Sequence, residues 1–255
     1  HEPRFFLFMA TLPPELWTRV VLFLPIEDLP AARSSCRLFA HLTHDERLWR
    51  RVHETFFPRE TKPSDLSFHD HCLCLLSRYP NTLLRRASFL GNRFMVDLAI
   101  SKGANDWNTA LCLAALGGHR RIIEMMIQRG VNCLGLALCY AAEGGHRDLV
   151  ELFISKGVNN WNGGMVNAAR GGHRSLVNLF ISKGANDWNW AMVYAARGGH
   201  RELVDLFISK GANRWNGGMA HAAKGGHRDL VDLFISKGAN NWNGGMARAA
   251  RGGHR

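Results

Sequence analysis

Residues 184–210 read GANDWNWAMVYAARGGHRELVDLFISK, and copies of this 27-residue stretch fill the chain from about residue 92 to its end. The histidine of each Gly-Gly-His-Arg marks the period, at His119, His146, His173, His200, His227 and His254. A fixed period of roughly 20 to 50 residues is typical of a solenoid, in which units pack on their neighbours and form an extended surface.

Each copy is predicted to contain two antiparallel helices. We expect Asn189 to cap a short first helix that ends near Ala196, because its side chain can accept hydrogen bonds from the amides of a first turn. Gly198 and Gly199 then break this helix, and Gly211 suits the left-handed residue that follows a second helix. The second helix carries apolar residues at helical spacing, which are Leu203, Val204, Leu206, Phe207 and Ile208, with Glu202 and Asp205 turned outward.

A single copy is too small to fold alone, so we expect neighbouring units to stabilise one another. An alanine pair in each first helix leaves little bulk and permits close helix approach. These pairs are Ala168-Ala169, Ala195-Ala196, Ala222-Ala223 and Ala249-Ala250. The repeated histidines lie in a row and cannot converge on one metal ion, so we expect them to brace the turn by hydrogen bonds.

The repeated unit resembles the second half of an ankyrin repeat. The matching residues are Ala195-Ala196, Gly198-Gly199-His200, Leu203-Val204, Leu206-Phe207 and Gly211-Ala212. Ankyrin units have about 33 residues and a Thr-Pro-Leu-His start, so this shorter unit lacks the protruding β-hairpin. The resemblance implies an all-α solenoid of helix-turn-helix units without fingers. Asn-Trp-Asn, as in residues 160–162, stands in place of the hairpin, and we expect a tight turn whose tryptophan packs between adjacent units.

The array is predicted to extend beyond its best copies. Residues 91–103 form a divergent second helix in phase with the later ones and suit an N-terminal cap. The sequence stops at Arg255, immediately before another second helix would begin, so we expect an array cut off mid-repeat. Adding that helix is expected to raise the melting temperature.

The first 60 residues lack the period and predict a separate three-helix module, either a structural cap for the solenoid or a functional domain. Their order resembles the F-box. The residues that carry this resemblance are Leu12-Pro13-Pro14-Glu15-Leu16, Val20, Leu24-Pro25, Asp28-Leu29, Cys36-Arg37, Phe39 and Leu48-Trp49-Arg50. The resemblance implies docking to a Skp-type adaptor of a cullin ubiquitin ligase. The implied contacts are Leu12, Pro13, Leu16, Val20, Leu24 and Pro25.

These features predict four segments. Residues 1–8 are a disordered or upstream segment, and residues 9–55 are the F-box. Residues 56–85 form a helical connector, and residues 86–255 form the ankyrin-like repeat array.

Comparison of the copies predicts a target-binding surface. The residues directly before and after the alanine pair vary from copy to copy while their framework hardly changes, and in the ankyrin arrangement the first helices line the concave face. The candidate target-binding residues are Tyr140, Glu143, Asn167, Arg170, Tyr194, Arg197, His221, Lys224, Arg248 and Arg251. The alternative interpretation is that these positions are simply unconstrained.

The formal net charge of +11 is periodic. The copy from Arg201 to His227 and the copy from Arg228 to His254 each contain four basic and two acidic residues, which gives +2. Stacking would align these charges into stripes that could bind nucleic acid or an acidic protein, or that only aid solubility.

Other chemistry finds little support. His69, Asp70, His71, Cys72 and Cys74 include metal-binding residue types, but their consecutive spacing fits neither paired cysteines nor a helical site, and a helix of mixed burial is favoured. The sequence contains no phosphate-binding loop, nucleophile elbow or zinc-protease motif. We therefore expect no enzyme activity, no metal and no cofactor.

The sequence as a whole predicts a substrate-recognition adaptor of a cullin-type ubiquitin ligase, with a Skp-type protein and an unknown target protein as partners. The alternative is a basic ankyrin-like scaffold that binds nucleic acid or acidic proteins. The combination resembles F-box/ankyrin proteins of large DNA viruses. The absence of a membrane-length apolar run and of disulfide spacing predicts a cytoplasmic or nuclear protein, in the host cell if viral.

Overall fold

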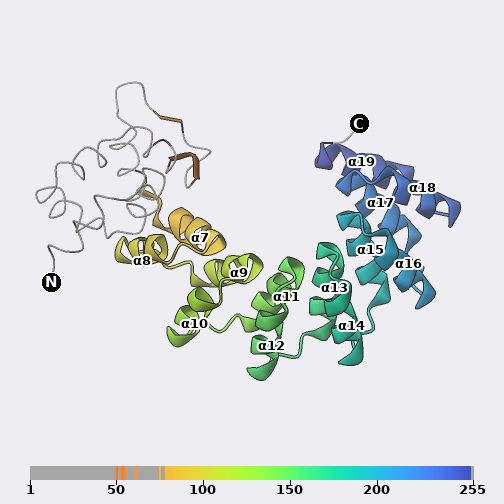
Figure 1. Cartoon of the computed structure of the whole chain (residues 1–255). Helices are drawn as coiled ribbons and strands as arrows, with labels where there is room; N and C mark the ends of the chain where they lie inside the picture. Colours follow the sequence, from red (N-terminus) through yellow and green to blue (C-terminus); the bar gives the residue numbers. More distant parts are fainter. Residues whose placement is uncertain (1–49, 51–52, 56–60, 63–74, 76–77, 254–255) are drawn as a thin grey trace, which may run out of the picture. The chain divides into compact units, whose positions relative to one another are not determined.

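The computed structural model describes residues 50, 53–55, 61–62, 75 and 78–253, and the regular structure in these residues is helical, with no β-strand. The chain divides into two compact units, residues 1–110 and residues 111–255 (Figure 1). The predicted all-α array without β-hairpin fingers is thus confirmed over the described residues.

Pairs of helices repeat every 27 residues, with 11 residues in the first helix of a pair and nine in the second. The first unit contains α7 (Pro80–Leu90), α8 (Arg93–Ser101) and the start of α9 (Trp107–Gly117), which continues into the second unit. The others are α10 (Arg120–Gln128), α11 (Leu134–Gly144), α12 (Arg147–Ser155), α13 (Trp161–Gly171), α14 (Arg174–Ser182), α15 (Trp188–Gly198), α16 (Arg201–Ser209), α17 (Trp215–Gly225), α18 (Arg228–Ser236) and α19 (Trp242–Gly252). The divergent helix expected in residues 91–103 is α8.

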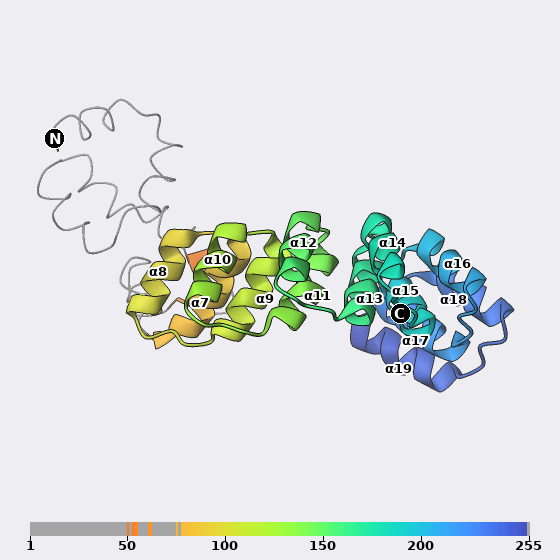
Figure 2. The ribbon, with the colours of Figure 1, turned by 90° about the horizontal axis from the view of Figure 1, so that it is seen from below.

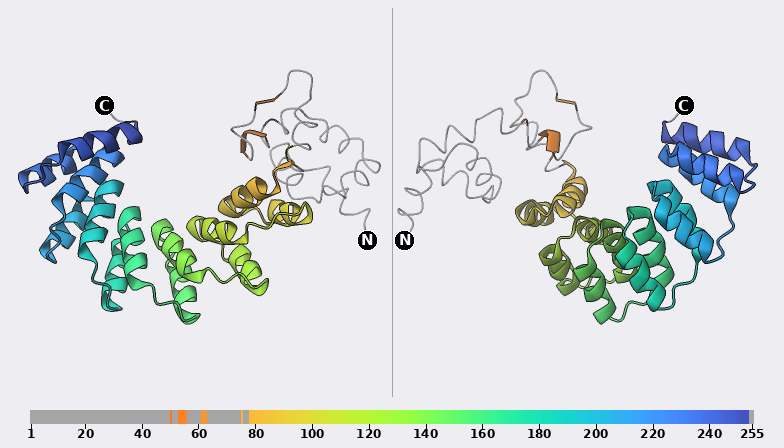
Figure 3. Two further views of the ribbon diagram at one scale, coloured as in Figure 1. Left: turned by 180° about the vertical axis from the view of Figure 1, so that it is seen from behind. Right: turned by 45° about the vertical axis from the view of Figure 1, so that its right-hand side comes forward.

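The second unit is built of two layers. Its first helices α11, α13, α15, α17 and α19 pack on one another in chain order, and each second helix packs on the first helix of its own repeat. The first helices form the inner layer of this unit (Figure 1, Figure 3), and a perpendicular view shows the same succession (Figure 2).

The core follows the predicted apolar pattern. In α16 Leu203, Val204 and Phe207 are buried, whereas Glu202 and Asp205 are exposed. Both alanines of the pair Ala195-Ala196 have no accessible surface. This alanine pair and the equivalent pair Ala168-Ala169, which is also fully buried, therefore allow the close helix approach that the sequence predicted.

The predicted role of Asn189 is wrong. The N-cap of α15 is Asp187, whose side chain accepts a hydrogen bond from the Trp190 amide at 3.2 Å. Because the helix already begins at Trp188, Asn189 lies within its first turn. The Asn189 side chain instead accepts from the backbone amides of Asn213 and Arg214 in the next repeat, at 2.9 and 3.0 Å.

This asparagine clamp recurs along the chain. Asn81, Asn162 and Asn216 each accept hydrogen bonds from two consecutive backbone amides of the following repeat. Gly135 occupies the same position in α11 and has no side chain to form the clamp. The joint between the repeats of α11 and α13 consequently lacks these two hydrogen bonds.

Restoring the clamp is expected to stabilise the protein. A Cβ atom on Gly135 would have no neighbour within 4 Å, so Gly135→Asn introduces no overlap. Two backbone amides would gain an acceptor, which is worth about 1 kcal/mol or more. Gly135→Ala serves as the control, since it gains only helix propensity, about 1 kcal/mol. In urea unfolding the free energy of unfolding should be larger for the asparagine variant than for the alanine variant. The reverse order would contradict a stabilising role of the clamp.

The tryptophan follows the two residues whose amides donate to the clamp. Its amide closes a tight turn, since the N–H of Trp188 donates to the carbonyl oxygen of Asn186 at 3.0 Å and the N–H of Trp215 to that of Asn213 at 2.9 Å. The predicted tight turn is therefore present, and its tryptophan is also the first residue of the first helix, as in α15 and α17. The Trp188 and Phe207 rings stack with centroids 6.4 Å apart, and Trp215 and Phe234 lie 6.5 Å apart. These ring contacts join the two helices of one repeat. The expected packing of the tryptophan between adjacent units stays a prediction.

The Gly-Gly-His connection joins adjacent repeats. His200 Nε2 donates to the carbonyl oxygen of Arg170 in the preceding repeat at 3.0 Å, and His146 and His173 make the same bond at 2.9 Å. Gly199 has φ +80°, a left-handed conformation that favours glycine. The predicted bracing by histidine is confirmed, and it extends across the boundary between repeats.

Several predictions lie outside the described residues. These are the six F-box docking residues, the segment His69 to Cys74, and the N-terminal residues 1–8. The domain boundaries stay a prediction, and α7 begins at Pro80, within the predicted connector. Of the helices in the described part, none is long and apolar enough to cross a membrane.

Candidate functional site

The predicted target-binding residues lie two per helix and one turn apart on the first helices α11, α13, α15, α17 and α19. Tyr140 and Arg251 are exposed, and seven others are half-buried. His221 differs from the expectation of a surface residue, because only 8% of it is accessible. Its ring packs 5.5 Å from the Tyr194 ring of the preceding repeat, which explains the burial.

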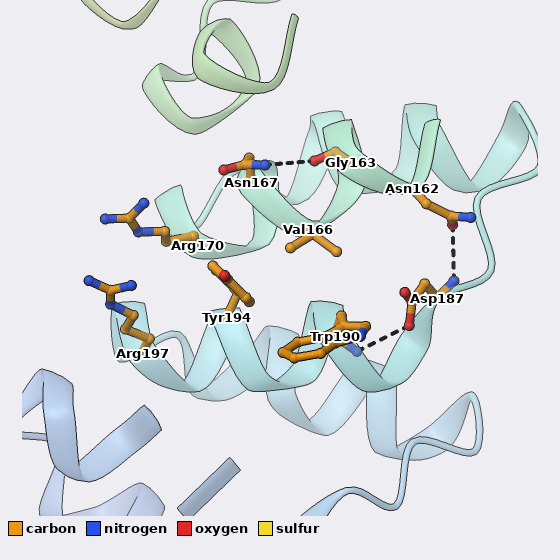
Figure 4. Close-up of a pocket in the computed structure, with 9 residues that line it drawn as sticks. All are labelled: Asn162, Gly163, Val166, Asn167, Arg170, Asp187, Trp190, Tyr194 and Arg197. Carbon is orange, nitrogen blue, oxygen red and sulfur yellow. Dashed lines mark hydrogen bonds between the residues drawn. The ribbon is translucent and has the colours of Figure 1, made fainter. Parts of the chain in front are cut away.

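A hollow of about 410 Å³ lies between α13 and α15. Figure 4 shows Arg170 and Arg197 at one end of this hollow, Tyr194 and Val166 in its middle, and Asp187 at the other end. Its lining consists of Asn162, Gly163, Val166, Asn167, Arg170, Asp187, Trp190, Tyr194 and Arg197. Four of the predicted residues, Asn167, Arg170, Tyr194 and Arg197, are thus brought together.

Trp190 is the functional candidate that the sequence prediction missed. Trp190 is 41% exposed, and the centroid of its ring lies 6.2 Å from the centroid of the Tyr194 ring. The adjacent repeats have Gly163 and Gly217 at this position, so neither places an equivalent side chain beside the indole. Variation at this position, one turn before the positions chosen, is the signal that could have identified it.

The guanidinium group of Arg214 lies 4.2 Å from the centroid of the Trp190 ring, within the range of a cation–π interaction. Arg214 is the N-cap residue of α17, in the next repeat. The contact holds the indole at the edge of the hollow and adds a cation there.

Acidic side chains neutralise only some of the basic side chains on the first helices. Arg170 pairs with Glu143 at 3.1 Å, and both are half-buried. In contrast, Arg197, Lys224 and Arg251 form no ion pair with any described residue. They occupy equivalent positions in the last turns of α15, α17 and α19, where a cation also favours the helix dipole.

The arginines that begin the second helices are largely neutralised. Arg147 and Glu151 pair at 2.8 Å, and Arg201 and Asp205 pair at 2.9 Å. Unpaired basic charge therefore remains on the inner face of the first helices from α15 to α19, here called the first-helix face. It also remains on exposed residues of second helices, such as Arg228 and Lys210.

The electrostatic potential is strongly positive around His221. An N–H group of Arg248 donates to Nε2 of His221 at 2.7 Å, which leaves the imidazole proton on Nδ1, and this buried atom has no hydrogen-bond partner among the described residues. Burial, followed by the charges of Arg248, Arg197, Lys224 and Arg214, lowers the pKa of His221 to about 4. His221 is therefore neutral at pH 7, and these four cations act on one point.

The described residues contain no group of three His, Cys, Asp or Glu side chains that could hold a metal ion. Burial raises the pKa of the Cys139 thiol to about 11, so little thiolate exists there at neutral pH. The chemistry that this face offers is recognition of anionic groups beside an aromatic pair.

Comparisons with known proteins agree with this organisation. The family described as ankyrin repeats (3 copies) matches residues 81–163 and 165–244, and the family described as F-box-like matches residues 9–55. Both predicted resemblances are confirmed by these matches. The resemblance to viral proteins stays a prediction.

Among solved structures, the human ASB11 ankyrin repeat domain matches 62% of this chain and 84% of its own, with 20% sequence identity and a TM-score of 0.39. No curated protein sequence matches this chain.

Proposed function

This chain belongs to the ankyrin-repeat proteins, and we propose that it is a substrate-recognition adaptor of a cullin-type ubiquitin ligase. The observation that carries the proposal is the presence of an F-box-like region at residues 9–55 and an ankyrin-repeat array in one chain. In this role the F-box-like region docks to a Skp-type protein, and the array holds a target protein without catalysing a reaction itself.

The first-helix face supports the target-binding part of this proposal. Most repeated residues are structural, because they build the helix caps, the clamps and the buried core. The variable residues gather instead around the hollow between α13 and α15 and along the last turns of α15 and α17. A constant scaffold that displays variable polar and aromatic residues suits recognition of a specific protein.

We assign docking of the Skp-type protein to Leu12, Pro13, Leu16, Val20, Leu24 and Pro25. We assign residues 9–55 to the F-box, residues 56–85 to the connector and residues 86–255 to the array, and we place the adaptor in the cytoplasm or nucleus. Such an adaptor requires no cofactor.

The proposal is tested by capture of a purified Skp-type protein on the full chain. Leu16→Asp with Val20→Asp is expected to weaken capture at least about tenfold, because a charged group would replace apolar contacts. The control is Leu136→Asp, which makes the same change at an exposed leucine of α11. Unchanged capture by the F-box variant, or no capture by the unaltered chain, would refute the ligase role.

The second candidate function is a nucleic-acid-binding scaffold. It is favoured by one observation, that the first helices carry both the unpaired cations Arg197, Lys224 and Arg251 and the exposed ring of Trp190, since cations and aromatic rings together bind single-stranded nucleic acid. Binding that weakens steeply with salt concentration would support this candidate.

A further inference from the structure

We propose that the first-helix face recognises an acidic, extended segment of the target protein, whose acidic side chains recur at about every third residue and meet Arg197, Lys224 and Arg251. This inference deepens the proposed function. It rests on that function for the identification of the segment as part of a target protein that the array holds.

The charge of the ligand follows from the row of cations. Arg170, Arg197, Lys224 and Arg251 lie in the last turns of successive first helices. Glu143 neutralises Arg170, but the other three form no ion pair with the described residues. The lowered pKa of the neighbouring His221, caused by burial and by Arg248 and other cations, reports the same positive potential. An anionic ligand would relieve this repulsion.

The spacing of the ligand charges follows from the helix packing. Packed helices lie about 8 to 10 Å apart, so equivalent residues of α15, α17 and α19 are separated by about that distance. A polyproline II segment rises about 3.1 Å per residue and has three residues per turn. Every third side chain therefore faces the same way and advances about 9 Å, which matches one helix of the stack.

The hollow supplies a site for an uncharged part of the segment. Trp190 and Tyr194 lie side by side along α15, and Val166 faces them from α13 (Figure 4). Aromatic grooves bind proline-rich segments well, because a polyproline II helix is preformed and loses little entropy on binding. A proline or an aliphatic side chain would fit here, beside α15, the helix that also carries Arg197, the first of the unneutralised cations.

A protein segment fits this face better than a nucleic acid does. Asp187 lies at the end of the hollow opposite Arg170 and Arg197 (Figure 4), and Glu143 lies beside Arg170. A continuous line of phosphates entering the hollow would meet these carboxylates, whereas a protein segment can place uncharged residues opposite them.

The test uses the full chain and two labelled peptides of about twelve residues. One repeats Pro-Pro-Glu, and the other has the same composition with its glutamates in one block. Binding is followed by fluorescence anisotropy for the unaltered protein and two variants. The double substitution Arg197→Glu with Lys224→Glu, here called the row variant, reverses two of the three unneutralised charges of the row. Lys183→Glu with Lys210→Glu makes the same charge change at the ends of second helices, where the lysines are the C-cap residues.

We expect the Pro-Pro-Glu peptide to bind better than the block peptide, and the row variant to lose at least about tenfold in affinity, with little loss in the lysine variant. Equal losses in both variants, equal binding of both peptides, absence of binding, or tighter binding of a single-stranded oligonucleotide would each overturn the inference. Capture of the Skp-type protein, measured on the same row variant, should stay unchanged. Failure of peptide binding with intact capture therefore overturns the inference alone.

Discussion

Gly198→Ala is expected to lower the free energy of unfolding by about 3 kcal/mol, within the range of overpacked core sites with a lost hydrogen bond. A Cβ atom at this position would overlap the carbonyl oxygen of Arg170 in the preceding repeat and lie 2.7 Å from Cδ2 of His200. The Arg170 backbone and the half-buried His200 ring cannot both move away, because the same carbonyl accepts the His200 hydrogen bond. The repeats of α13 and α15 would have to separate.

The measurement is urea unfolding of the full chain, and Gly135→Ala is the matched control. Both glycines belong to first helices, Gly135 as the second residue of α11 and Gly198 as the last residue of α15, but Gly135 has open space where a Cβ would be added. The control should gain stability because alanine has a higher helix propensity than glycine, whereas Gly198→Ala should lose stability. Equal effects of the two substitutions would show that helix propensity, and not contact between repeats, decides the outcome.

The same close contact explains how a 27-residue unit stacks without a β-hairpin. The first glycine of Gly-Gly allows the preceding carbonyl to approach, the second takes the left-handed conformation, and the histidine ties the two repeats together. The asparagine clamp supplies a second link at the other end of the first helix. Two polar links on either side of a buried alanine pair thus fix the register of neighbouring units.

The period, the helix pairs and the buried stripe could be predicted from the sequence, because apolar spacing and glycine positions determine them locally. The role of Asn189 could not, since an asparagine near a helix start can cap its own helix or reach a neighbouring one. Only the position of Trp188 as the first helical residue decides between these roles.

The role of the candidate site residues stays a prediction. Variation between copies indicated Tyr194 and Arg197, and both of them line the hollow. It did not indicate the hollow itself, which depends on the small residue Gly163 facing Trp190 from another repeat. The burial of His221 could not be predicted from the sequence either, because it depends on the side chains that adjacent repeats place around it.

His221 is expected to make stability depend on pH. Its pKa falls from an ordinary value of 6.5 to about 4 in the folded protein, so the unfolded chain binds more protons between these values. The contribution to stability is complete above pH 6.5 and is lost as the pH falls from 6.5 to 4. It amounts to at most about 3 kcal/mol, at 1.36 kcal/mol for each pH unit.

The comparison that isolates this effect is His221→Asn, because Asn167 occupies the equivalent position in the array and bonds to the Gly163 carbonyl at 2.9 Å. The groups that face His221 are Tyr194 and Arg197 of α15, Lys224 and Arg214 of its own repeat, and Arg248 of α19. The other histidines are the same in both proteins, so their contributions cancel in the difference. Urea unfolding at pH 7 and pH 4.5 should therefore show a smaller loss of stability in the variant. Identical losses would mean that the imidazole accepts a proton as readily in the folded protein as in the unfolded chain, which four surrounding cations and burial should prevent.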